Sequence, residues 1–327
     1  MRQLISHLRL CAVIAGTSIL AACAPTQYLV KSPEPSTVTY QSGSGAAAGR
    51  VALVDNRKGT ERNFFGGTLT STLQSDGAPI EPTAFLRKHM QAEMKARGLP
   101  LTFVDAGTAG AEVAKLETFR VQNHRASGFG PFVTFTFAAL DVPTPSGPKR
   151  VTAFVKRGKV PVWGFDEVIE PTLNQPLSLA VKELSAKWAR DAYGAKAPDA
   201  AVSQLAASLS AKRDGDSYLT VYALGFTNNP AAIGHLLPLV KDADENVRLA
   251  AISSLGTLKA TGQMKLLKDI YADRGVIWQD RAMAIKAIGD LGTDESRAFL
   301  GEELKRWEAA GNQNEATWTA NIIRLYL

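Results

Sequence analysis

The 327-residue sequence has only two cysteines, Cys11 and Cys23, and both lie near its start. Without a later cysteine, the rest of the chain offers neither a disulfide nor a thiol nucleophile. Histidines are also few, and His89, His124 and His235 stand too far apart in the sequence for the ligand spacing of a zinc site. The HExxH, GxSxG and P-loop motifs are absent. We therefore expect no catalytic residues, no metal, no cofactor and no enzymatic activity.

A membrane-spanning segment is not indicated either. The apolar run from Leu10 to Ala22 is shorter than the about 20 residues that a membrane span requires. Arg2 and Arg9 precede this run, and small residues close it. A basic start, a short apolar run and a small-residue end are typical of an export signal. We therefore expect residues 1–22 to be removed on export.

The end of this run, Leu20-Ala21-Ala22-Cys23, resembles the lipobox of bacterial lipoproteins. The resemblance implies cleavage before Cys23, a diacylglycerol on its sulfur and usually an acyl chain such as palmitate on its new amine. The alternative is an ordinary signal peptide that is cleaved at a nearby alanine. Ala24 is similar to the residue that follows the cysteine in lipoproteins sorted to the outer membrane. The resemblance thus implies a lipid-anchored protein of the bacterial cell envelope, facing the periplasm.

The charge of the chain is unevenly distributed. Loss of residues 1–22 leaves 35 basic and 31 acidic side chains, a net charge of +4. Residues 24–198 carry 21 basic and 15 acidic side chains (+6), whereas residues 199–327 carry 14 and 16 (−2). Two interpretations stay open: the basic half faces anionic lipid or peptidoglycan beside the anchor, or its charges are scattered and solvated. We expect no nucleic-acid partner for an exported chain.

The first half of the chain predicts a tether and one domain. Residues 23–49 are rich in Pro, Ser, Thr, Gly and Ala without a period, which predicts a flexible tether. Residues 50–197 alternate between strand and helix patterns, and His89 is expected at the surface or boundary of a helix over 82–99. This order predicts an α+β domain with a mostly antiparallel sheet and helices on one face. The stretch VALVDNR at 51–57 is similar to small envelope lipoprotein domains of the YajG kind.

Residues 199–327 contain an internal repeat. Residues 218–242, 246–270 and 280–304 share one frame, in which an apolar-Gly pair recurs after 31 (255 − 224) and 33 (288 − 255) residues. Self-similarity at this period predicts stacked units of two helices and a turn. Small residues allow close helix approach, and several residues are candidates for helix caps: Asn229, Asp244, Thr261 and Thr293.

The stretch DADENVRLAAISSLG at 242–256 resembles a HEAT repeat of the short, PBS-lyase-like type. The resemblance covers residues 217–304 and implies an all-α solenoid that binds other macromolecules. Arg248 and Arg281 occupy the same position in two copies and are candidate interaction residues. The alternative is that they pair with aspartates between stacked helices, namely Asp242, Asp244 or Asp280.

Together these features favour a lipid-anchored, non-catalytic scaffold or assembly accessory of the envelope, whose protein partner stays unidentified. The first alternative is a ligand-binding accessory of an envelope transport system. An apolar cleft near Phe132 and Trp163 would favour that alternative, and a filled interior there would favour scaffolding. A second alternative, implied by the PBS-lyase resemblance alone, is an enzyme related to HEAT-repeat lyases, which no catalytic cluster supports.

Overall fold

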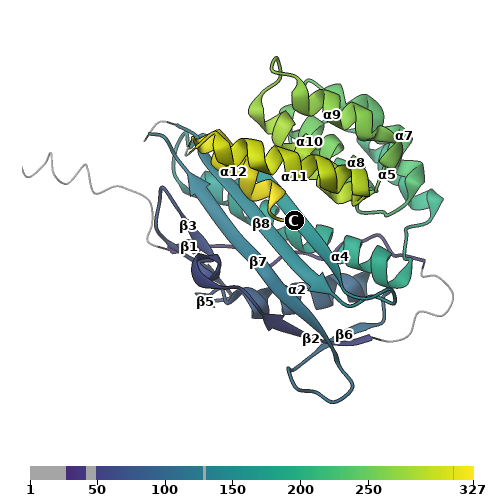
Figure 1. Ribbon diagram of the computed structural model, residues 1–327. Coiled ribbons are helices and arrows are strands. Elements are labelled where there is room, and N and C mark those ends of the chain that lie inside the picture. The colour runs from purple at the N-terminus through teal and green to yellow at the C-terminus, as the bar shows by residue number, and fades with distance from the viewer. Residues whose placement is uncertain (1–26, 42–48, 128–129, 312) are drawn as a thin grey trace, which may run out of the picture.

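The computed structural model describes residues 27–41, 49–127, 130–311 and 313–327. A sheet-containing N-terminal region is followed by a helical region that begins at Asp166 (Figure 1). The predicted fold class, an α+β region followed by helical repeats, is confirmed.

The main sheet has six strands and is mixed. Strands β7, β8 and β9 form its longest ladders and are antiparallel, whereas β6, β2 and β3 add parallel pairs in the order β6-β2-β7-β8-β9, with β3 also on β7. A small second sheet has the order β1-β4-β5. The strands are β1 (Gln27–Leu29), β2 (Gly49–Asp55), β3 (Phe65–Gly67), β4 (Thr72–Ser75), β5 (Ala78–Pro79), β6 (Leu101–Val104), β7 (Glu112–His124), β8 (Phe132–Val142) and β9 (Lys149–Lys159).

Helices cover both faces of the main sheet, so the prediction of helices on one face holds only for the helices of the first domain. Ala138 and Leu140 of β8 pack toward α2 (Pro82–Ala96) and α4 (Gln175–Tyr193), which lie on one face. Phe135 and Phe137, which alternate with them, pack against the helical repeats on the other face. A strand that is buried on both faces needs apolar residues at every position, which explains the nearly continuous apolar run of β8.

The prediction of a flexible tether was wrong for residues 27–41. Tyr28 is fully buried among aromatic rings, and Tyr40 is buried beside Arg97. Gln41 pairs with Lys196 through backbone hydrogen bonds of 2.8 and 3.1 Å. The polar composition of the segment concealed a few large side chains whose burial holds it on the body. Residues 1–26, with Cys23, and residues 42–48 lie outside the described residues.

The helical region consists of paired helices in which the first helix of each pair faces the sheet (Figure 1). The pairs are α6 (Ser217–Gly225) with α7 (Ile233–Leu236) and η4 (Leu237–Lys241), α8 (Glu245–Thr257) with α9 (Met264–Ala272), and α10 (Trp278–Leu291) with α11 (Asp294–Ala309). Helices α5 (Asp199–Ala211) and α12 (Asn314–Ile323) flank them. Shorter helical segments are η1 (Gly59–Arg62), α3 (Asp166–Ile169), η2 (Glu170–Asn174), η3 (Pro230–Ala232) and η5 (Thr261–Gln263).

The glycine of each repeat marks a close approach of its inner helix to the segment packed against it, which is the next inner helix in the first two repeats. A methyl group on Gly256 would lie 2.5 Å from the Cα atom of Ala287 on the next inner helix. A methyl group on Gly225 or Gly289 would likewise collide, with Ser254 in the first case and with Tyr326 in the second. The apolar-Gly pairs therefore recur because only glycine permits this spacing.

The helix caps that the sequence indicated are mostly present. Asn229, Asp244 and Thr293 each accept a hydrogen bond from a backbone N–H in the first turn of the following helix. Thr261 was wrong as a cap, because it lies inside η5 and its side chain caps no helix.

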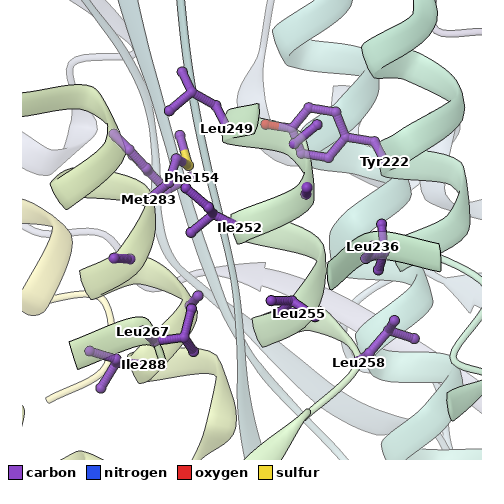
Figure 2. Close-up of a cluster of buried hydrophobic side chains, with 14 of the residues drawn as sticks. Phe154, Tyr222, Leu236, Leu249, Ile252, Leu255, Leu258, Leu267, Met283 and Ile288 are labelled. Atoms are coloured by element: carbon purple, nitrogen blue, oxygen red, sulfur yellow. The ribbon is translucent and has the colours of Figure 1, made fainter. Parts of the chain in front are cut away.

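One apolar core joins the repeats to the sheet. Figure 2 shows side chains from α6, α8, α9 and α10 converging on a cluster that reaches Phe154 of β9. On the same face, Trp278 and Trp318 pack against Phe135, with Trp318 at 4.8 Å between ring centroids. The inner face of the repeats is therefore an internal surface of the protein.

Candidate functional site

Titratable and metal-ligating side chains are the first candidates for chemistry among the described residues. Within them, no group of three or more His, Cys, Asp or Glu side chains is arranged to hold a metal ion. His89, which was expected at the surface or boundary, is buried against Phe85, with ring centroids 4.4 Å apart. Burial lowers the pKa of His89 to about 4, so its ring is neutral at neutral pH. None of the described helices is long and apolar enough to cross a membrane.

A pocket of about 490 Å³ lies where residues 31–38 cross the surface between α4 and the first repeat helices. Its apolar walls come from three helices, α4, α5 and α6, and from the residue that ends α6: Leu179, Leu205, Leu219 and Phe226. Its polar lining comes from residues 31–37 on one side and from η2 and α4 on the other, and it includes charged groups of both signs: Lys31, Glu34, Arg97, Glu170 and Lys182. The pocket therefore exists only because the segment after the predicted anchor is folded onto the body.

Charged groups fix one side of this pocket. Arg97 is buried and donates from Nε to Glu93 Oε1 at 2.6 Å and from Nη2 to Ser36 Oγ at 3.1 Å. The other Glu93 oxygen accepts from the backbone N–H of Ser36 at 2.7 Å. Tyr40 donates to the Phe226 carbonyl, and burial raises the pKa of its hydroxyl to about 12. Burial also lowers the pKa of the Lys182 ammonium in the pocket wall.

A second cluster of charged side chains joins the sheet region to the repeats. Lys187 of α4 donates to Asp290 of α10 at 2.5 Å and to the backbone carbonyl of Thr152 on β9 at 2.7 Å. Lys286 of α10 bridges Asp290 at 2.7 Å and contacts Glu183 of α4. All four side chains of this interface cluster, Glu183, Lys187, Lys286 and Asp290, are at most 4% exposed. Through the Thr152 carbonyl the cluster also reaches β9, which is the last strand of the sheet.

The electrostatics of the interface cluster follow from its burial and from the opposite charges within it. Burial opposes the charged form of Lys286, but Asp290 and Glu183 outweigh it and raise the pKa of the ammonium. Burial likewise opposes the charged form of Asp290, and the two lysines outweigh it and lower the pKa of that carboxyl. For Lys187, burial dominates and lowers the pKa. Two positive and two negative groups make the cluster neutral as a whole, which reduces its desolvation cost.

The sequence search missed both the pocket and the interface cluster. One signal was available: Glu183 and Lys187, and likewise Lys286 and Asp290, are opposite charges four residues apart within apolar helix segments. A charge in such a segment needs a buried partner. The partners come from helices more than 100 residues apart, so the pattern alone does not pair them.

Arg248 and Arg281 are engaged with neighbouring helices. Arg248 Nε donates to both carboxylate oxygens of Asp280, at 3.0 and 3.1 Å, and its Nη1 donates to the carbonyl of Asp242 at 2.7 Å. Arg281 donates to the Val276 carbonyl at 2.8 Å and pairs with Glu315 of α12. This geometry favours the pairing alternative, with Glu315 replacing the expected aspartate for Arg281.

The outer helices α9 and α11 present a different surface. Their exposed side chains are mostly charged and form ion pairs of mixed sign, such as Lys268 with Glu295 at 2.6 Å and Lys305 with Glu302 at 2.8 Å. Because the inner helices contact the sheet, this outer face is the repeat surface that is open to another macromolecule.

The cleft that the ligand-binding alternative required near Phe132 and Trp163 is not formed by the described residues. Phe132 is fully buried against Tyr28 and Phe165, with ring centroids 6.3 and 5.1 Å away. Trp163 instead lies on the surface. The filled interior favours scaffolding, and the pocket beside residues 31–38 is a separate feature.

Comparison with known protein families gives a match over part of the helical region. Residues 195–277 match HEAT repeats, which covers the first two helix pairs and α5. No curated protein matches the chain. HEAT repeats indicate a protein-interaction or scaffold role.

Proposed function

We propose that this protein is a lipid-anchored, non-catalytic component of the bacterial cell envelope that acts as an interaction scaffold or assembly accessory. The observation that carries the proposal is the HEAT match over residues 195–277, together with helix pairs whose outer face is open. The Leu20–Cys23 lipobox resemblance supplies the anchor. An anchor confines the repeats to a thin layer at the membrane, which raises their effective concentration for partners in that layer.

The proposed partner surface is the outer face of α9 and α11. The test is affinity capture from an envelope extract with the full chain, because the isolated repeats would expose the apolar inner face that packs on the sheet. Reversing the charges of Lys268 and Lys305 to glutamate should abolish capture of a specific partner, since both form ion pairs on the outer face, with side chains 33% and 73% exposed. Arg248→Ala is the contrasting variant and should lower stability. If the Arg248→Ala variant is fully folded and still fails to capture the partner, the assignment of the partner surface to α9 and α11 is contradicted.

The anchor has a separate test with a matched control. Cys23→Ala should move the exported protein from the membrane fraction to the soluble fraction, and mass spectrometry of the original chain should find a lipidated Cys23. Cys11→Ala should change neither result, because Cys11 would leave with the signal peptide. An unmodified thiol at Cys23, or membrane fractionation of Cys23→Ala, would overturn the anchor.

The pocket supports a second candidate function, a ligand-binding accessory of an envelope transport system. Its apolar walls and the Lys182 ammonium suit an amphipathic small molecule with an anionic group. Native mass spectrometry of the full protein should then detect a co-purified small molecule that is lost from Lys182→Glu and retained by Lys212→Glu, a change at an exposed lysine. An empty protein under these conditions would favour scaffolding alone.

A further inference from the structure

An ordered loop after β9 exposes three large apolar side chains. Val160 is 45% exposed, Val162 is 64% exposed and Trp163 is 94% exposed. We call these three side chains the apolar tip. A tryptophan with an apolar body and a polar N–H is well suited to the boundary between lipid and water.

The apolar tip is held in place from both sides. Glu167 Oε1 accepts hydrogen bonds from the backbone N–H groups of Val162, of Trp163 at 2.8 Å and of Gly164 at 3.4 Å. Phe165 then returns into the body, where its ring stacks on Tyr28 at 5.3 Å with an interplanar angle of 17°. The loop is therefore fixed by a carboxylate at its base and an aromatic anchor at its end, and its apolar side chains are presented outward.

The position of the apolar tip relates it to the proposed lipid. Tyr28 lies in β1, which starts at Gln27, four residues after Cys23. Four residues span at most about 14 Å. If Cys23 carries acyl chains, as the proposed function holds, β1 and the ring of Phe165 beside it lie close to the same bilayer. Membrane contact at this end of the molecule therefore rests on that proposed function.

The charges around the apolar tip are balanced. Three acidic side chains stand near three basic ones: Asp166, Glu167 and Glu170 with Lys31, Arg125 and Lys159. Lys31 and Glu170 form an ion pair of 3.0 Å. With no net charge, the tip has little electrostatic attraction for anionic lipid, and its affinity for a membrane depends on apolar burial.

We propose that the apolar tip inserts into the membrane interface beside the lipid anchor. Two attachment points, the acyl chains at Cys23 and the side chains of Val162 and Trp163, then fix the orientation of the body on the bilayer. A single flexible anchor would leave the body free to rotate, whereas two points hold its remaining surfaces at set angles to the membrane.

The first test uses the full protein, reconstituted into phosphatidylcholine vesicles that contain brominated acyl chains. The other tryptophans are buried or half-buried: Trp188, Trp278, Trp307 and Trp318. Bromine should therefore quench mainly the emission that Trp163→Phe removes, and the quenching should not require phosphatidylglycerol. Emission from Trp163 that is unquenched, or quenched only with anionic lipid, would overturn the proposal.

The second test uses cysteine labelling, since the chain has no cysteine after Cys23. Val162→Cys on vesicles should react with a membrane-impermeant maleimide about tenfold more slowly than Ile277→Cys, the factor expected when roughly nine in ten tips are inserted. Ile277 is the control because it is an exposed apolar residue of the repeat region, 42% exposed. Equal rates would overturn the proposal.

Mass spectrometry of the same samples distinguishes a failure of the lipid anchor from a failure of the apolar tip to insert. A lipidated Cys23 with equal labelling rates means that the anchor stands and the apolar tip does not insert. A free Cys23 thiol means that the proposed function fails, and quenching of Trp163 in that sample would still support insertion of the tip.

Discussion

The inner and outer helices of the repeats carry the same charge pattern in opposite environments. Lys286 and Asp290 on α10, and Lys265 and Asp269 on α9, are both pairs at i and i+4, and both are 2.7 Å apart. The side chains of the first pair are 0% and 3% exposed, whereas those of the second are 87% and 60% exposed. The same spacing of opposite charges therefore gives a buried ion pair within the interface cluster in one helix and a solvated surface pair in the other.

This difference shows what the repeats do within the molecule. Their inner face is committed to the sheet through an apolar core and a buried neutral cluster of four charges. Their outer face is left for solvent or for a partner. A solenoid that stood free of the first domain would have offered both faces.

The largest expected effect comes from breaking the buried pair. Lys286→Ala should destabilise the protein by about 3–5 kcal/mol, because it leaves the buried carboxylates of Glu183 and Asp290 with too few partners. Lys265→Ala should cost no more than about 0.5 kcal/mol, because its pair is solvated. Urea unfolding of both variants gives the comparison. Equal losses would show that burial does not distinguish the pairs.

An intermediate effect is expected from the helix spacing. Gly256→Ala should destabilise the protein by about 1–3 kcal/mol, because its methyl group would collide with the backbone of Ala287. Gly301→Ala, on the outer helix α11, meets nothing within 4 Å and should stabilise the protein by about 0.5–1 kcal/mol. Thermal unfolding should therefore give shifts of opposite sign. A stabilised Gly256→Ala variant would contradict the close approach.

The smallest expected effect is a pH dependence of stability. It compares His89, which is buried without a compensating charge, with the interface cluster, whose charges compensate one another. The pKa of His89 is lowered from 6.5 to about 4 in the folded protein. Below pH 6.5 the unfolded chain therefore binds a proton at His89, whereas the folded chain binds it only near pH 4. Stability should therefore fall between pH 6.5 and 4, by at most about 2 kcal/mol for a partly solvated site.

Urea midpoints at pH 7.5, 5.5 and 4.5 measure the His89 effect. His89→Gln removes the titrating group, so its midpoint should depend less on pH in this window than that of the original chain. Asp290 should add nothing there, because its lowered pKa places its loss of stability below pH 4. A variant with an unchanged pH dependence would assign the effect to another group.

Local patterns in the sequence predicted those features that depend on residues close together in the chain. Strand and helix patterns over residues 50–197 indicated the α+β class, and the recurring apolar-Gly pair indicated the stacking period, which the close approach of Gly256 to Ala287 explains. The helix caps at Asn229, Asp244 and Thr293 could also be predicted, because a cap depends only on residues within one turn of the helix. The predictions for residues 27–41 and for His89 were wrong, since composition and position in a helix do not reveal which other segment of the chain packs against these residues.

The sequence by itself determined the α+β class of the first domain, the helical repeat and its spacing, because these depend on periodicity and on contacts between neighbours along the chain. Only the tertiary structure decided that the repeats fold back on the sheet, that four charges meet between α4 and α10, and that residues 31–38 close a pocket. Those features join residues more than 100 positions apart. Their free energy depends on which partner excludes water from which charge, and no local pattern specifies that choice.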